Sequence, residues 1–325
     1  MSVEFKTPWW LPDGHSQTIW SAKVALPTTE RVHWARSTWS TPDGDVIQVD
    51  SHVPQQTGPI VVLFHGLEGS SQSHYAKAFA QVCTEQGWSL VLPHFRGCGG
   101  PMNLAPRAYH SGDHEEIDWM LKRVKALHPG RALMAVGVSL GGNALMKWAA
   151  EHGREAQDTV QAVVAVSSPL DLTAAGKAID QGVNRWLYAR MFLSTMREKA
   201  QRKWDQYPGL FDLKKALEAT TLEAFDDAFT APLHGFKGVE DYWSRASAKP
   251  VLQQVKLRAL LMNAMNDPFV PAQSLPEQSQ VATDTTVWRP HHGGHVGFVE
   301  QLSPTDWRGH VLAMPRAVCA WLAKG

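Results

Sequence analysis

Short runs of hydrophobic residues alternate with segments of helical periodicity along most of the chain. Continuous apolar runs of this kind are typical of parallel strands that are buried on both faces of a sheet. They predict strands at residues 59–64, 88–92, 132–136, 160–166, 257–262 and 285–288. Periodicity predicts helices at residues 75–86, 114–127, 144–149, 272–280 and 311–323.

Residues 33–54 have a different pattern, in which polar and apolar positions alternate. The turn sequence Thr41-Pro-Asp-Gly-Asp45 divides this segment, and Asp-Gly between alternating segments is typical of a β-hairpin. A hairpin followed by alternating strands and helices predicts an α/β fold with a mostly parallel central sheet and helices on both faces.

The alternation of strands and helices stops near residue 171 and resumes near residue 250. The segment between them is rich in charged and aromatic residues and has no convincing strand pattern. We therefore interpret residues 171–249 as an inserted helical cap on a core formed by residues 1–170 and 250–325. Residues 1–30 are too apolar for a disordered tail, and we expect an irregular N-terminal extension packed on the core, with a structural role for His15.

One strand-to-helix junction carries the sequence Gly137-Val-Ser139-Leu-Gly141. A strand, G-x-S-x-G and a helix, in that order, are typical of a nucleophilic serine held in a strained turn at the top of a sheet. Small residues are needed at positions 137 and 141, because a side chain there would meet the neighbouring strand or helix. The motif is short, so an ordinary glycine-rich turn is the alternative interpretation.

A serine nucleophile needs a base and an acid, and both residue types follow the last two predicted strands. Asp267 follows the strand at 257–262, and His295 follows the strand at 285–288. We prefer His295 as the base, because Gly293-Gly294 would let the backbone bring it over the sheet edge. The competing residues are His291 and His292 for the base, and Asp226, Asp227 and Asp284 for the acid.

An acyl-transfer site also needs hydrogen-bond donors for a negatively charged oxygen. We expect these donors to be the backbone N–H groups of Leu140 and Leu67, with Glu68 N–H as the neighbouring alternative to Leu67. His65 would then be structural and bond this loop. Cys98 is a candidate for a second nucleophile, but we favour a small buried thiol, since no activating residue can be assigned to it.

Charge and cysteine content exclude several other classes of function. The 325 residues include 31 Lys+Arg and 31 Asp+Glu, so nothing indicates binding to nucleic acid or to an anionic membrane. The three cysteines form no C-x-x-C motif, which argues against a zinc site or a disulfide framework and fits a reducing compartment. Neither a signal peptide nor an apolar run of about 20 residues is visible, so we expect a cytoplasmic protein without integral membrane association. We expect no cofactor or metal.

Several sequence blocks taken together resemble one known family. They lie at residues 15–18, 64–70, 94–98, 109–112, 137–143, 225–227, 267–269 and 292–298. In these blocks the chain is similar to the YheT-like family of α/β-hydrolases, the α/β-hydrolase 4 family of esterases. The resemblance implies the α/β-hydrolase fold, a carboxylic-ester substrate and a charge relay of Ser139, Asp267 and His295. The order serine, aspartate, histidine along the chain is also the order that α/β-hydrolases use.

The sequence therefore predicts a serine carboxylic-ester hydrolase that acts on small-molecule esters with short-to-medium acyl chains. One alternative is an acyltransferase or ester synthase, in which an alcohol resolves the same acyl-enzyme. Some relatives are discussed as acyltransferases through a His-x4-Asp motif, but the position after His110 that would hold the aspartate is Glu115. The other alternative is a non-catalytic binding protein with the hydrolase fold.

Overall fold

The computed structural model describes residues 3–28, 31–54, 57–301, 303 and 305–324. Its central element is an eight-stranded sheet with the spatial order β1-β2-β4-β3-β5-β6-β7-β8. β2 is antiparallel to β1 and to β4, and all other neighbouring strands are parallel. The strands are β1 (Ala35–Ser40), β2 (Val46–His52), β3 (Ile60–Phe64), β4 (Ser89–Pro93), β5 (Leu133–Val138), β6 (Ala162–Val166), β7 (Arg258–Met262) and β8 (Thr285–Trp288).

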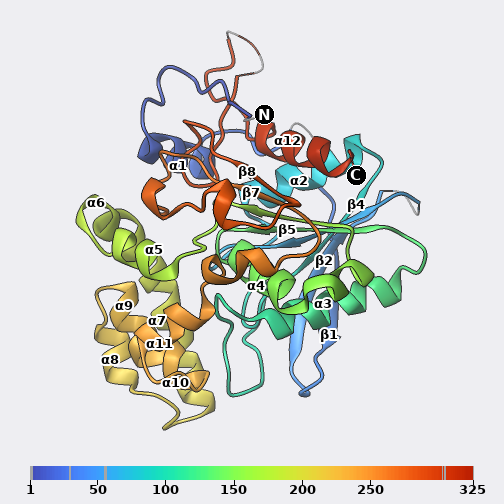
Figure 1. Cartoon of the computed structure of the whole chain (residues 1–325). Helices are drawn as coiled ribbons and strands as arrows, with labels where there is room; N and C mark the ends of the chain where they lie inside the picture. Colours follow the sequence, from blue (N-terminus) through green and yellow to red (C-terminus); the bar gives the residue numbers. More distant parts are fainter. Residues whose placement is uncertain (1–2, 29–30, 55–56, 302, 304, 325) are drawn as a thin grey trace.

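Helices cover both faces of this sheet (Figure 1). The four that do so are α2 (His74–Glu85), α3 (His114–Leu127), α4 (Leu140–His152) and α12 (Ala313–Leu322). Successive side chains of a strand point to opposite faces, so Val61 and Leu63 of β3 pack with α2 and α12, whereas Val62 packs with α3 and α4. Burial on both faces explains why the strands appear in the sequence as continuous apolar runs. The predicted α/β fold class is confirmed.

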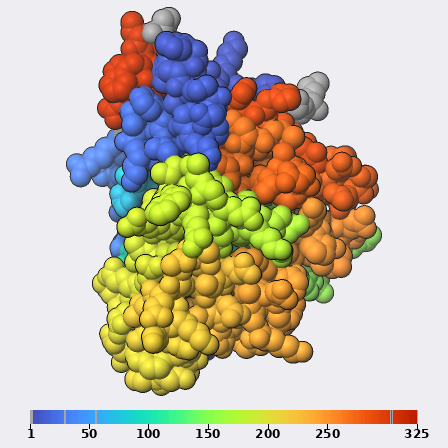
Figure 2. All heavy atoms as spheres, turned by 90° about the vertical axis from the view of Figure 1, so that its left-hand side faces the viewer, coloured from blue at the N-terminus to red at the C-terminus, as the bar shows by residue number. Residues whose placement is uncertain are grey.

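Between β6 and β7 the described chain forms helices and no strand. The α-helices of this segment are α5 (Leu172–Ile179), α6 (Gly182–Asn184), α7 (Arg190–Gln206), α8 (Leu213–Glu218), α9 (Leu222–Phe225), α10 (Ala231–Leu233) and α11 (Val239–Ala246). They lie to one side of the sheet, and Figure 2 shows them as a continuous block below the N-terminal segment. We refer to residues 171–249 as the insertion. Its status as a cap separate from the core stays a prediction.

The N-terminal extension differs from the expectation of an irregular chain, because it contains α1 (Gly14–Lys23). Asp13 caps this helix by accepting a hydrogen bond of 2.9 Å from Ser16 N–H. The buried residues of α1 are Gly14, Gln17, Thr18 and Ser21. None of them is a large apolar residue, so the helix lacks the apolar stripe by which periodicity detects helices.

The segment at residues 272–280 also differs from its prediction as a helix. It contains only two short 3₁₀ turns, Ala272–Ser274 and Gln278–Gln280. Pro276 lies between them, and a proline has no N–H to donate and disfavours helical geometry in the residue before it. No helix in the described part of the chain has both the length and the apolar character needed to cross a bilayer.

A buried ion network fixes the loop that follows β4 to the hairpin. Arg96, whose side chain is only 2 % exposed, donates to Asp45 and Asp43 in and beside the hairpin turn, each at 2.8 Å. It also donates to Glu116 of α3 at 2.6 Å. Asp45 and Glu116 are both buried, and Arg96 forms an ion pair with each of their carboxylates.

Replacing Arg96 with methionine is expected to lower the free energy of unfolding by about 3–5 kcal/mol, because it leaves buried carboxylates without a cation. Urea denaturation measures this loss. A suitable control is Lys122→Met, which removes an exposed pair with Asp118 and is expected to cost at most about 1 kcal/mol. A loss below about 1 kcal/mol in Arg96→Met would show that the network does not stabilise the fold.

Candidate active site

Ser139 lies in the sharp turn between β5 and α4. Its backbone has φ 52° and ψ −122°, a strained conformation for a residue with a side chain. The flanking glycines are required by close approach: a Cβ at Gly137 would lie 2.4 Å from Gly142 Cα of α4. A Cβ at Gly141 would lie 2.5 Å from the carbonyl oxygen of Phe64, at the end of β3. The turn therefore presents Ser139 above the sheet at the cost of backbone strain.

Ser139, His295 and Asp267 are connected by hydrogen bonds, although they come from three different loops. The distance from His295 Nε2 to Ser139 Oγ is 3.0 Å, and the distance from His295 Nδ1 to Asp267 Oδ2 is 2.9 Å. The Asp267 side chain is fully buried and that of His295 is 10 % exposed. Asp267 Oδ1 also accepts from Phe269 N–H at 2.8 Å and from Val270 N–H at 3.3 Å. These two amides fix the orientation of the carboxylate.

The competing histidines and acids make no hydrogen bond to Ser139 or His295 in the described part of the chain. His291 and His292 are both exposed, as is Asp284. Asp226 is half-buried in the insertion and lines the cavity beside Ser139, where it accepts from Thr230 Oγ1 at 2.6 Å and from Trp243 Nε1 at 2.9 Å. Asp227 accepts from Val239 N–H. Burial raises the pKa of Asp226 to about 6. Of the candidates for base and acid, the structure brings only His295 and Asp267 to Ser139.

Two residues of α1 hold the loops that carry the acid and the base, a role that the sequence did not predict. Gln17 Oε1 accepts from Asn266 Nδ2 at 2.9 Å and from Gly293 N–H at 2.8 Å. Thr18 Oγ1 accepts from His295 N–H at 2.8 Å. The block at residues 15–18 was a signal for these contacts, but it did not indicate what the side chains bind. The N-terminal segment is therefore part of the support of this site.

The expected oxyanion donors face the same region. Leu140 is the first residue of α4, so its N–H has no carbonyl acceptor within the helix. Neither Leu140 N–H nor Leu67 N–H has a hydrogen-bond partner among the residues that the structure describes, and both residues line the cavity beside Ser139. The N–H of Glu68 is already bonded to the hydroxyl of Tyr109 at 3.0 Å. This contact favours Leu67 over Glu68 as the second donor.

His65 and Cys98 have the structural environments that we expected. His65 is fully buried; its Nδ1 bonds Gly66 O at 2.7 Å and its Nε2 accepts from Phe95 N–H at 3.1 Å. Burial lowers the pKa of His65 to about 3, so it is neutral and fixes two loops. Burial raises the pKa of Cys98 to about 11, which keeps it a thiol, although Lys199 Nζ lies 3.2 Å from its sulfur.

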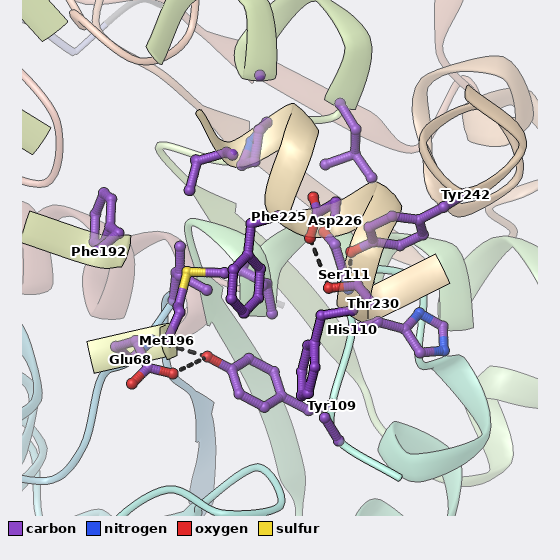
Figure 3. A pocket seen from close by; sticks show the side chains of 18 of the residues that line it. Glu68, Tyr109, His110, Ser111, Phe192, Met196, Phe225, Asp226, Thr230 and Tyr242 are labelled. Atoms are coloured by element: carbon purple, nitrogen blue, oxygen red, sulfur yellow. Dashed lines mark hydrogen bonds between the residues drawn. The ribbon is translucent and has the colours of Figure 1, made fainter. Parts of the chain in front are cut away.

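A cavity of about 140 Å³ is lined by Ser139 and by residues of the insertion. Figure 3 shows part of its wall, including Phe192, Met196 and Phe225. Most of its wall is apolar, and the residues include Leu67, Leu140, Leu172, Ile179, Phe192, Met196, Leu222, Phe225, Phe229 and Phe269. Phe269 also packs on the ring of His295, with the centroids 4.2 Å apart. In the described residues no group of three or more His, Cys, Asp or Glu side chains is arranged to hold a metal ion.

Comparison with known proteins shows which family the chain belongs to. The family model described as the alpha/beta hydrolase fold matches residues 59–302, which is most of the chain. The chain belongs to the α/β-hydrolase family. Within it, the chain is 35 % identical to the protein named Putative esterase YheT of Escherichia coli K12, over 90 % of this chain and 87 % of that protein. The resemblance to YheT-like proteins is therefore confirmed.

Other relatives of this α/β-hydrolase are named as lipid-cleaving enzymes. It is 25 % identical to human Phospholipase ABHD3 over 91 % of this chain and 73 % of that protein. Among solved structures, a bacterial membrane phospholipase A matches with a TM-score of 0.57 at 18 % identity, over 90 % of this chain and 86 % of that one. Est1E of Butyrivibrio proteoclasticus, with ferulic acid bound, matches with a TM-score of 0.55 at 16 % identity, over 89 % and 98 %. These structural likenesses show the shared fold.

Proposed function

We propose that this α/β-hydrolase is a serine carboxylic-ester hydrolase in which Ser139 is the nucleophile. The observation that carries the proposal is the hydrogen-bonded series Ser139, His295 and Asp267 at one end of an apolar cavity. A hydroxyl is a weak nucleophile by itself, and an adjacent base activates it by accepting its proton. His295 Nε2 is within hydrogen-bond distance of Ser139 Oγ and is free to be that base when Nδ1–H points to Asp267.

The reaction begins when Ser139 Oγ bonds to the ester carbonyl carbon while its proton moves to His295 Nε2. Asp267 keeps the imidazole in the required tautomer and stabilises the imidazolium that forms. The tetrahedral intermediate collapses, the C–O bond to the alcohol breaks, and His295 returns the proton to the departing alkoxide oxygen. Water then attacks the acyl-enzyme with the same base and releases the carboxylic acid and Ser139.

Negative charge on the carbonyl oxygen is stabilised by the amides of Leu67 and Leu140. Both N–H groups are without partners within the described residues, and Leu140 N–H lies at the positive end of the α4 dipole. Donors that are already oriented need no rearrangement as the charge forms, and the loss of one such donor costs about 10²- to 10³-fold in kcat.

The preferred substrate is an ester with a short-to-medium acyl chain. The cavity is lined by apolar side chains of Leu67, in the loop between β3 and α2, and of helices α7 and α9. Such a wall suits a hydrocarbon chain rather than a peptide. The cavity volume of about 140 Å³ is consistent with a limited chain length. Relatives named as an esterase and as phospholipases are consistent with ester substrates.

A series of p-nitrophenyl esters from acetate to palmitate tests the function. We expect turnover with an optimum at short-to-medium chains, and labelling by a fluorophosphonate that peptide mass spectrometry locates on Ser139. Adding ethanol or glycerol distinguishes the acyltransferase, because a transesterified product would then replace part of the acid. Absence of both turnover and labelling would contradict the proposal and favour a binding protein.

A further inference from the structure

The loop that carries Leu67 is held on both sides by tyrosine hydroxyls. Tyr75 OH of α2 accepts from Gly66 N–H at 3.0 Å, and Tyr109 OH accepts from Glu68 N–H at 3.0 Å. The amides before and after Leu67 are thus bonded, while Leu67 N–H itself has no partner among the described residues. The backbone of Glu68 has φ 56°, so this segment depends on its surroundings to keep its conformation.

The Glu68 side chain closes a ring with Tyr109. Tyr109 OH donates to Glu68 Oε1 at 2.8 Å while it accepts from the Glu68 amide, and Figure 3 shows the two side chains pointing toward each other. Burial raises the pKa of Tyr109 well above its usual value, and the Glu68 carboxylate adds to this effect. The phenol therefore keeps the proton that it donates to Glu68.

Lys199 of α7 connects this ring to the insertion. Its Nζ lies 2.8 Å from Glu68 Oε1 and 3.2 Å from Cys98 Sγ, and its ammonium group is 5.6 Å from the centre of the Tyr109 ring. Burial alone would lower the pKa of Lys199, but the neighbouring Cys98 and Glu68 raise it. The pair is therefore a charged contact between the insertion and the Leu67 loop.

A second lysine on the same face of α7 makes a contact of a different kind. Lys203, one helical turn after Lys199, donates to the carbonyl oxygens of Asn103 at 3.0 Å and Ala105 at 2.8 Å. It fastens α7 to the core, yet none of its hydrogen bonds reaches the Leu67 loop. A substitution of Lys203 therefore serves as a control, because it weakens the attachment of α7 to the core without removing a contact with the Leu67 loop.

We propose that Glu68, Tyr109 and Lys199 are positioning residues that aim Leu67 N–H at the reacting oxygen and make this aim depend on the docking of α7. The inference rests on the proposed function, since Leu67 N–H acts on the oxyanion of that reaction. Lys199 neutralises Glu68 and holds its carboxylate where Tyr109 can donate to it. Without Lys199, the unpaired Glu68 carboxylate is better solvated if it turns toward water. Tyr109 then loses the acceptor of its hydroxyl proton, and the hydroxyl no longer stays fixed beside the Glu68 amide.

Kinetics of Lys199→Met and Tyr109→Phe on a soluble p-nitrophenyl ester test the proposal. We expect kcat to fall about 10- to 100-fold, because an oxyanion donor misplaced by an ångström loses most of its effect. Lys199 and Tyr109 also line the cavity, so the short ester p-nitrophenyl acetate is used. With it we expect KM to change by less than about threefold, since the lost groups stabilise the transition state. Lys199→Arg, which restores the cation, is expected to recover most of the lost kcat.

The control is Lys203→Met, which should lower Tm without a comparable loss of kcat. An equal fall of kcat in Lys203→Met, or a kcat within twofold of wild type in both Lys199→Met and Tyr109→Phe, would overturn the proposal. Hydrogen exchange at the Glu68 amide gives a readout that needs no turnover, and we expect it to be about tenfold faster in Lys199→Met than in wild type. Unchanged exchange contradicts this inference alone, whereas ester turnover that does not need Ser139 contradicts the proposed function.

Discussion

Replacing Ser139 with alanine is expected to lower ester turnover by about 10⁴- to 10⁶-fold. The alanine has no oxygen to form the acyl-enzyme, and His295 then has no hydroxyl to deprotonate. A small rate remains, because the cavity and the amides of Leu67 and Leu140 still bind the ester near water. The fold should be unaffected, because alanine takes the same backbone conformation at position 139 as the serine that it replaces.

The measurement compares wild type, Ser139→Ala and Ser194→Ala, a variant at an exposed position on α7. Turnover of a p-nitrophenyl ester, covalent labelling by a fluorophosphonate and Tm are recorded for each protein. Ser194→Ala should match the wild type in all three. Turnover that persists in Ser139→Ala, and that the added substitution Cys98→Ala then abolishes, would instead identify Cys98 as the nucleophile.

The sheet was the most predictable part of the fold. β3, β5 and β6 are buried on both faces, so each appears in the sequence as an uninterrupted apolar run. The hairpin was equally clear, because Asp43-Gly44 lies between two alternating segments. Both patterns depend only on residues that are neighbours along the chain, so one sequence is enough to predict these elements.

The parts that the sequence did not predict depend on contacts between distant residues. α1 buries Gln17 and Thr18, which bond Gly293 and His295 some 280 positions away. Polar residues in a short helix give no periodicity, so only the partner loop explains their burial. Lys199 is similar: in the sequence it belongs to a charged stretch, and its contact with Glu68 exists only after α7 docks on the core.

The candidate site was predictable in its residue types but not in its geometry. G-x-S-x-G, Asp267 and His295 each follow a predicted strand, and the carboxyl ends of parallel strands meet at one edge of the sheet. The sequence left His292 as a competitor, and the structure separates the two histidines by the turn through Gly293. That turn places His292 in solvent and His295 against Ser139.

Asp267→Asn is expected to reduce kcat by about 10⁴-fold while the protein stays folded. Asp267 Oδ1 accepts from the amides of Phe269 and Val270, so the carbonyl oxygen of the asparagine must occupy that position. Its NH2 group then faces His295 Nδ1, which lies 2.9 Å from Oδ2 in the wild type. The imidazole can meet this donor only as the tautomer with the proton on Nε2.

In that tautomer His295 presents N–H to Ser139 Oγ and cannot accept the serine proton, so the nucleophile is not activated. Asp284→Asn is the matched control, because Asp284 was a competing acid and is exposed, and it should leave kcat within about twofold of wild type. A loss in Asp267→Asn smaller than about tenfold would mean that another group orients the imidazole. Because the two backbone amides of Phe269 and Val270 determine which way the asparagine turns, this substitution tests the hydrogen-bond geometry of the site and not only its charge.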